Sequence, residues 1–315
     1  MDLFFGQLQN GVVLGALYAL IALGYTMVYG IIQLINFAHG EIFMVGAFGA
    51  LSVFTWGSLQ GTTTWVALPL MLVGAVIVSV TTAVLAERFA YRPLRNAPRL
   101  APLITAIGLS IFLQELVRTS LPIPGGNDIL DGATSAQPFP QLIAGESFDL
   151  GVTKISRINA TIIIVALLCM VGLILFVNRS RTGRAMQATA QDPDTARLMG
   201  INVNRIIVTA FVLGAVLAAV AGLMQGLRNG IIDNRIGFIA GLKAFTAAVL
   251  GGIGNIGGAV LGGFFLGLVE TMATTYMPGE FGGGAWKDAW AFVVLVLVLV
   301  LRPQGLLGEK VADRA

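Results

Sequence analysis

Three polar side chains that can bind a solute or transfer a proton lie close together in an otherwise apolar segment: Asn36, His39 and Glu41. Amide, imidazole and carboxylate groups are costly in a nonpolar environment unless they face protein or water. Phe37 and Gly40 lie between them. These residues predict either a helix break that lines a substrate pathway or a set of hydrogen bonds that joins two helices.

A second group of candidate pathway residues lies about 200 residues later and has Lys243 as its charged member. Its other members are Phe238, Gly241 and Phe245. A lysine in an apolar segment can bind a substrate carboxylate, pair with an acid of a partner chain, or extend its amine to the membrane surface. We expect one of the last two roles for Lys243.

Two more acids, Glu115 and Glu270, lie within apolar segments. Glu115 and Arg118 are three residues apart and can pair on one helix face. Glu270 has no basic neighbour at helical spacing. Together with His39 and Glu41, these acids leave a proton-coupled carrier open as an alternative function.

A polar stretch over residues 179–205 carries helix signals between two apolar segments. Asp192 suits an N-cap, Pro193 the first helical position and Gly200 a C-terminal stop. We therefore expect a short helix over about 193–199, flanked by turns. So short a helix is marginal alone, and it needs a docking partner, for which a protein fits better than lipid headgroups. The candidate docking residues are Gly183, Arg184, Ala190, Asp192, Pro193, Asp194, Arg197 and Gly200.

Several classes of site are excluded by what the sequence lacks. It has no Gly-x-x-x-x-Gly-Lys-[Ser/Thr] run to hold ATP and no His-Glu-x-x-His metal motif. It has one histidine, His39, and one cysteine, Cys169, so neither a His/Cys metal cluster nor an internal disulfide is expected. Nothing indicates covalent catalysis, and we expect neither an enzyme nor a cofactor bound by this chain.

The elements that position these residues are predicted to be membrane helices. Of the 315 residues, 56% are hydrophobic and 11% are charged, whereas soluble chains are about one quarter charged. A membrane-spanning helix needs about 20 apolar residues. We expect a single all-α polytopic domain over residues 1–315, with about eight to nine transmembrane segments; residues 236–250 are tilted, broken or re-entrant. The nine apolar segments are 8–29, 31–55, 64–86, 100–121, 159–177, 206–227, 236–250, 256–277 and 286–301.

The distribution of basic residues predicts the orientation of these segments. If all nine span the membrane, twelve of the 19 basic residues lie on one side and five on the other. The more basic side is expected to be cytoplasmic. This prediction places the N-terminus outside and the C-terminus inside, with the 179–205 loop in the cytoplasm and the 122–158 loop, which has a possible short hairpin, on the outer face.

Two stretches of the sequence also resemble each other. Gly30-Ile31-Ile32 precedes Phe37-Ala38-His39-Gly40, and Gly230-Ile231-Ile232 precedes Phe238-Ile239-Ala240-Gly241. The predicted orientation places the two copies on opposite sides of the membrane. They therefore suggest an inverted repeat in which two broken helices face each other near the membrane midplane. Coincidence among common apolar residues is the alternative.

Five stretches of the sequence carry a resemblance to a known family: Ala19–Gly30, Ile35–Glu41, Tyr91–Arg95, Leu100–Ile104 and Lys243–Gly254. In these stretches, and over nearly the whole chain, the sequence resembles the permease subunits of bacterial branched-chain amino acid importers of the ATP-binding-cassette type. The resemblance implies a multi-pass protein of the bacterial inner membrane that works by alternating access. The 183–201 stretch resembles the motif by which such permeases engage their ATPase.

The resemblance also implies partners. These are a second, homologous permease, two P-loop ATPase subunits that bind ATP and Mg²⁺, an extracytoplasmic solute-binding protein and membrane lipid, with no nucleic acid. The family includes permeases for urea and short amides, which leaves the substrate open. A small-solute channel that works alone remains the alternative outside this family.

Overall fold

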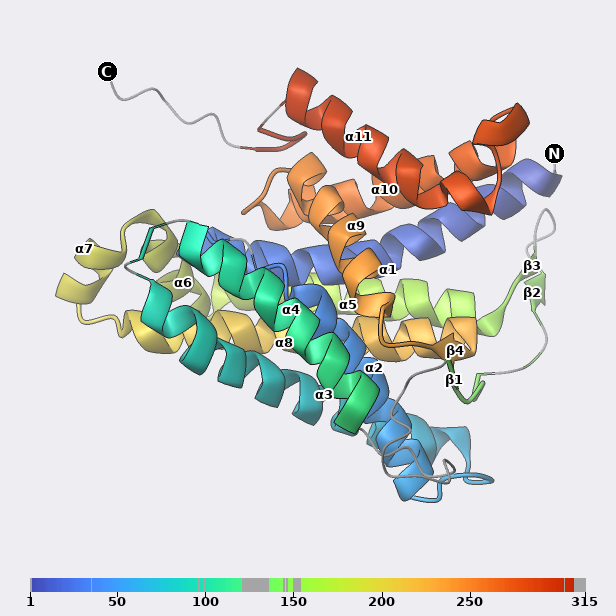
Figure 1. The fold of residues 1–315 in the computed structure, drawn as a ribbon, viewed down its shortest axis with the longest axis horizontal. Coiled ribbons are helices and arrows are strands. Elements are labelled where there is room, and N and C mark those ends of the chain that lie inside the picture. Colours follow the sequence, from blue (N-terminus) through green and yellow to red (C-terminus); the bar gives the residue numbers. More distant parts are fainter. Residues whose placement is uncertain are drawn as a thin grey trace.

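The computed structural model describes residues 2–34, 36–95, 97–98, 100–120, 136–143, 145, 147–149, 154–302 and 304–308. These residues form a helical bundle with very little strand (Figure 1). The α-helices are α1 (Asp2–Ile32), α2 (His39–Trp56), α3 (Thr64–Leu85), α4 (Leu100–Ser120), α5 (Arg157–Arg179), α6 (Arg181–Gln191), α7 (Pro193–Leu198), α8 (Val203–Asn229), α9 (Ile236–Gly251), α10 (Ile256–Tyr276) and α11 (Lys287–Leu301). The other elements are the π-helical turn η1 (Ala86–Tyr91), the 3-10 turns η2 (Arg92–Leu94), η3 (Gly279–Phe281) and η4 (Gly284–Trp286), and the strands β1 (Gln137–Pro138), β2 (Phe148–Asp149), β3 (Lys154–Ile155) and β4 (Ile231–Ile232).

Each of the nine predicted apolar segments contains a helix, so the prediction of an all-α polytopic membrane protein is confirmed. Seven helices in the described part of the chain are long and apolar enough to cross a membrane. The other two predicted segments correspond to α2 and α9, which have 18 and 16 residues. The predicted segment 31–55 starts too early, because α1 continues to Ile32 and α2 begins at His39.

The core of the bundle is formed by α1, which packs against α10, α8, α9 and α5. In the most apolar part of α1, 94% of the residues are buried, whereas only 6% of residues Gly284–Leu301, which contain α11, are buried. The exposed apolar side chains of α3, α4, α5 and α11 face outward, as expected for helices in lipid. The centre of the fold is therefore α1 with its neighbours, and α11 lies at the edge.

Close helix crossings depend on glycine pairs four residues apart. Gly11 and Gly15 of α1 pack against Gly263 and Gly267 of α10. A Cβ atom at Gly15 would lie 2.7 Å from Cα of Phe264, which is too close for any side chain. Small residues at such a spacing allow membrane helices to approach at backbone distance.

The two ends of the bundle differ in structure (Figure 1). At one end, here called the α7 end, α6 and α7 project from the bundle. At the opposite end, the strand end, β1 pairs with β4 and β2 pairs antiparallel with β3 near the start of α1. The β2–β3 pair agrees with the hairpin expected in the 122–158 loop, of which residues 122–135, 144, 146 and 150–153 lie outside the described residues.

Candidate functional site

The first candidate site is the crossing of α2 and α9, the helices of the two predicted segments that are not among the seven candidate membrane spans. A Cβ atom at Gly241 would lie 2.8 Å from Cα of Gly40, and one at Gly40 would collide with the backbone of Gly237. Gly40 and Gly241 are equivalent positions of the predicted repeat. Contact between equivalent positions is what a two-fold axis through the crossing produces. The inverted repeat remains a prediction, and this contact supports it.

The break between α1 and α2 places Asn36 and His39 in the interior. The hydroxyl of Tyr91 donates to Oδ1 of Asn36 at 2.5 Å. The imidazole of His39 packs edge-on against the ring of Tyr25, with 4.8 Å between ring centroids, and it also meets Gly24. Among the described residues, Nδ2 of Asn36 and Nε2 of His39 are buried without a hydrogen-bond partner.

Glu41 is completely buried in the same crossing. Its Oε1 accepts hydrogen bonds from Ser110 (2.9 Å) and Gln114 (2.8 Å), both on α4. Its Oε2 has no partner among the described residues and lies beside Gly237, in the first turn of α9. The partial positive charge at the start of a helix favours an acid in this position. Glu41 thus connects α2, α4 and α9.

The candidate phenylalanines divide between this crossing and the surface. The rings of Phe37 and Phe245 are 5.4 Å apart and, with Tyr25, border the helix break. Phe238 is half exposed on the outer face of α9. The structure therefore brings Phe37 and Phe245 together with the polar residues and leaves Phe238 apart from them.

A second candidate site is the buried cluster of charges around Lys243. Its amine lies 2.8 Å from Oε1 of Glu270 on α10 and 2.5 Å from Oδ1 of Asp288 on α11. Lys287 is 3.3 Å from Glu270, and the hydroxyl of Tyr18 donates to the same carboxylate at 2.8 Å. The expectation that Lys243 pairs with a partner chain or extends to the membrane surface is wrong, because its partners are in its own chain.

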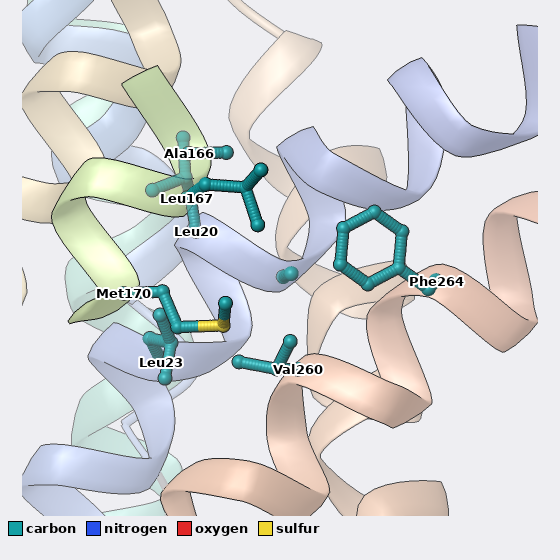
Figure 2. Close-up of a pocket in the computed structure, with 8 residues that line it drawn as sticks. Leu20, Leu23, Ala166, Leu167, Met170, Val260 and Phe264 are labelled. Carbon is teal, nitrogen blue, oxygen red and sulfur yellow. The ribbon is translucent and has the colours of Figure 1, made fainter. Parts of the chain in front are cut away.

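This cluster borders a cavity of about 300 Å³ at the strand end, between α1, α2, α8, α9 and the start of α11. A second pocket, between α1, α5 and α10, is lined by apolar side chains such as Leu20, Met170 and Phe264 (Figure 2). Its volume of about 10 Å³ is close to that of a single water-sized probe, so it cannot hold a solute. Of these two, the cavity beside Lys243 is the one that can hold a small molecule.

The third candidate site is the projecting α6–α7 segment. The short helix expected over about 193–199 is confirmed as α7. Asp192 accepts from the hydroxyl of Thr195 and from the backbone N–H groups of Thr195 and Asp194, which hold the pKa of Asp192 below its ordinary value. Arg197 pairs with Asp194 at 2.7 Å.

The turn expected before α7 is in fact the 11-residue helix α6. Ser180 caps it by accepting from the backbone of Gly183, and Met186 is buried on its inner face. Ser180 and the spacing of Gly183 and Met186 are the local signals of this helix. Gly183 itself is in contact with backbone at the end of α5, so no larger residue fits there.

The other predicted docking residues differ in their positions. Arg184 is exposed and donates weakly to the carbonyl of Arg179. Ala190 is partly buried, and Pro193 and Gly200 are exposed on either side of α7. Gly200 has φ +83, a left-handed conformation that ends the helix.

A network at the α7 end links η1 to the start of α8. The side chain of Glu87 is almost fully buried and pairs with Arg95, which also donates to Asn204 at 2.6 Å. Tyr91, from the same turn, reaches Asn36 at the helix break. The sequence did not identify Glu87, Tyr91 or Asn204 as functional candidates. Tyr91 is 55 residues from Asn36, and Asn204 is 109 residues from Arg95, so no local spacing relates them.

Comparison with known proteins places this architecture among transport proteins. The family described as branched-chain amino acid transport system, permease component, matches residues 7–301. The high-affinity branched-chain amino acid transport system permease protein LivH of Salmonella typhimurium is 44% identical over 99% of this chain and 97% of its own length. The corresponding protein BraD of Pseudomonas aeruginosa is 46% identical over 98% of this chain and 97% of its own length.

One solved structure has the same overall fold. It is PsaBC from Streptococcus pneumoniae in complex with Fab, with a TM-score of 0.52 over 95% of this chain and 92% of that chain. The sequence identity is 12%, so this likeness concerns the fold alone.

Proposed function

Because this chain belongs to the family of permease components of branched-chain amino acid transport systems, we propose that it carries branched-chain amino acids across the bacterial inner membrane. It acts as one membrane subunit of an importer of the ATP-binding-cassette type. The observation that carries this proposal is the match to permeases over almost the full length of the chain. Urea and short amides gain no specific support from the structure.

The partners follow from the same proposal. A second, homologous permease completes the pathway, two ATPase subunits bind ATP and Mg²⁺, and a solute-binding protein delivers the amino acid from outside. The α7 end is cytoplasmic, because residues 179–205, which include α6 and α7, carry five arginines, and basic loops of membrane proteins lie on the cytoplasmic side. The start of α1 is then outside.

The tip of α7 supports docking of an ATPase subunit. The side chains of Leu198 and Met199, at the C-terminal end of α7, are 88% and 78% exposed. Exposed apolar side chains at the end of a projecting helix are typical of a contact with another protein. Alternating access would move the crossing of α2 and α9, where Asn36, His39 and Glu41 border the pathway.

The alternatives outside this class are weakened to different degrees. A proton-coupled carrier needs an acid free to exchange its proton, but Glu270 is held by Lys243, Lys287 and Tyr18. Glu41 keeps Oε2 without a partner among the described residues, so a carrier that uses Glu41 stays an alternative. A channel that works alone gives no role to the exposed tip of α7.

The proposal is tested by mild detergent purification from the native host, with the co-purifying proteins identified by mass. A second permease and a P-loop ATPase are expected. Isolation of this chain alone, as an oligomer that passes solute without ATP, would favour the channel.

The coupling role is tested with Leu198→Ser combined with Met199→Ser. Loss of the apolar tip is expected to lower both recovery of the ATPase and ATP-dependent leucine uptake by at least tenfold, with unchanged insertion of the permease. Met277→Ser removes an exposed apolar side chain outside the α7 end and serves as the control. Undiminished ATPase stimulation in the double variant would contradict the assignment of α7.

A further inference from the structure

We infer that the cavity beside Lys243 is a binding site for a single zwitterionic amino acid with an aliphatic side chain. This inference rests on the proposed function and names a place in this chain where the substrate stops. Its volume of about 300 Å³ is at the lower end of the range of about 300–1,000 Å³ for small-molecule pockets. It therefore suits one amino acid rather than a peptide.

The charged residues of the cavity occur in two places at its rim. Asp233 and Arg235 precede α9, and Lys287 and Asp288 open α11. The side chains of Lys287 and Asp288 are 44% and 50% exposed, so each retains access to a ligand beyond its contact with the buried cluster. An acid and a base side by side can bind an ammonium and a carboxylate of the same molecule.

The inner part of the charge cluster makes the site selective for a molecule without net charge. Lys243 is already paired with Glu270 and Asp288, and Glu270 also faces Lys287. Among the residues that line the cavity and the adjoining Glu270, the three cations Arg235, Lys243 and Lys287 are equal in number to the three acids Asp233, Asp288 and Glu270. A zwitterion preserves this balance, whereas a purely anionic or cationic ligand leaves one charge unmatched in a partly buried site, which is costly.

The remaining wall of the cavity is apolar apart from Gln225 and the hydroxyl of Tyr18. Its apolar part is formed by Leu17 and Ile21 of α1, Phe43 of α2, and Ile236 and Ile239 of α9. Removing apolar surface from water is favourable in proportion to the area removed. A branched aliphatic side chain against this wall therefore adds affinity that glycine cannot obtain.

The position of the cavity connects the strand end with the helix crossing. It begins at Asp233, before α9, and extends to Lys243, which lies roughly 10 Å along the helix axis from Ile236, the first residue of α9, at about 1.5 Å per residue. Ala240 and Phe43 in its wall lie one and three residues from Gly241 and Gly40. A bound amino acid would thus lie between the strand end, which faces outward in the proposed orientation, and the crossing of α2 and α9.

The test is direct binding of radiolabelled L-leucine to the purified transporter with its second permease and ATPase subunits, in phosphatidylcholine nanodiscs without the solute-binding protein. Three competitors each lack one feature of leucine: 4-methylpentanoate the ammonium, 3-methylbutylamine the carboxylate, and glycine the aliphatic side chain. We expect each to compete at least tenfold more weakly than leucine. Equal competition by any of the three would overturn the proposed recognition.

Variants assign the binding to this cavity. Lys287→Gln and Asp288→Asn should each weaken leucine binding at least tenfold, and Ile239→Trp should block it by filling the apolar wall. Arg118→Gln, which removes an exposed cation of α4, is the matched control and should bind leucine normally. Normal binding in both Lys287→Gln and Ile239→Trp would move the site elsewhere and overturn the inference.

Three further results separate this inference from the proposed function and from binding of a lipid headgroup. If the wild-type complex imports leucine with its solute-binding protein but binds none without it, the cavity is not a substrate site and the transport function stands. If phosphatidylethanolamine displaces leucine from the nanodisc complex, the zwitterion at the site is a lipid headgroup. If the assembled wild-type complex imports no branched-chain amino acid, the proposed function itself fails.

Discussion

Two ion pairs of almost equal length occupy very different surroundings. Lys243 and Glu270 are 2.8 Å apart, with 4% and 0% of their side chains exposed, and they join α9 to α10. Arg197 and Asp194 are 2.7 Å apart, with 58% and 86% exposed, and both belong to α7. The comparison teaches that the distance between two charges does not determine what their pairing contributes.

Burial determines the consequence of losing one partner. Removing one member of a buried pair leaves an uncompensated charge and costs about 3–5 kcal/mol. An exposed pair contributes about 0.2–1 kcal/mol, since water and salt screen it. The buried cluster therefore holds the bundle together at the start of α11, whereas the exposed pair leaves α7 free to serve a partner.

The largest expected effect is that of Lys243→Met. It leaves Glu270 with only the half-exposed Lys287 and the hydroxyl of Tyr18, and it should destabilise the protein by about 3–5 kcal/mol. The measurement is the thermal unfolding midpoint of the purified permease in detergent. Adding Glu270→Leu should recover part of the loss, because no unpaired buried acid then remains. If Lys243→Met alone is as stable as the wild type, the buried pair contributes no more than the exposed one, and the contrast between them fails.

A smaller loss is expected at the helix crossing from a substitution that adds a methyl group and removes no charge. Gly40→Ala places a methyl group against the backbone of Gly237 and should cost about 1–3 kcal/mol through overpacking. The same thermal assay applies, together with leucine uptake by the assembled transporter. Gly108→Ala is the matched control, because nothing lies within 4 Å of a Cβ atom there. Equal stability and leucine uptake of the two variants would show that α2 and α9 can move apart at Gly40 without loss.

The smallest change in stability is expected for Arg197→Gln. Because the pair with Asp194 is exposed, the free energy of unfolding should fall by no more than about 1 kcal/mol, which is a small shift of the thermal midpoint. Leucine-stimulated ATP hydrolysis should nevertheless fall, since the side chain faces the proposed ATPase. A large loss of stability with normal hydrolysis would reverse the distinction between the two pairs.

Local sequence signals predicted a large part of this structure. Apolar runs located all nine segments, because a helix in lipid satisfies its backbone hydrogen bonds within the segment itself. Asp192, Pro193 and Gly200 predicted α7, since capping depends on residues a few positions apart. The likeness between residues 30–40 and 230–241 suggested two broken helices that face each other, and the structure brings α2 and α9 into contact at Gly40 and Gly241.

The contacts of individual polar residues could not be predicted in this way. Lys243 is 27 residues from Glu270 and 45 from Asp288, and Glu41 is 69 residues from Ser110. No pattern of spacing along a helix relates residues so far apart. For the same reason the sequence pointed to pairing of Lys243 outside the chain, and it gave no sign of the cavity that Asp233, Lys287 and Asp288 border.

The sequence by itself determined that this protein is polytopic and helical, where its nine apolar segments lie and how α7 is capped, because hydrophobic burial and capping act over short stretches of chain. Only the tertiary structure decided which buried charges neutralise each other, which glycines meet, and where a cavity remains. These properties depend on how α1, α9, α10 and α11 pack, and packing brings together side chains whose relation is not encoded in their separation along the chain.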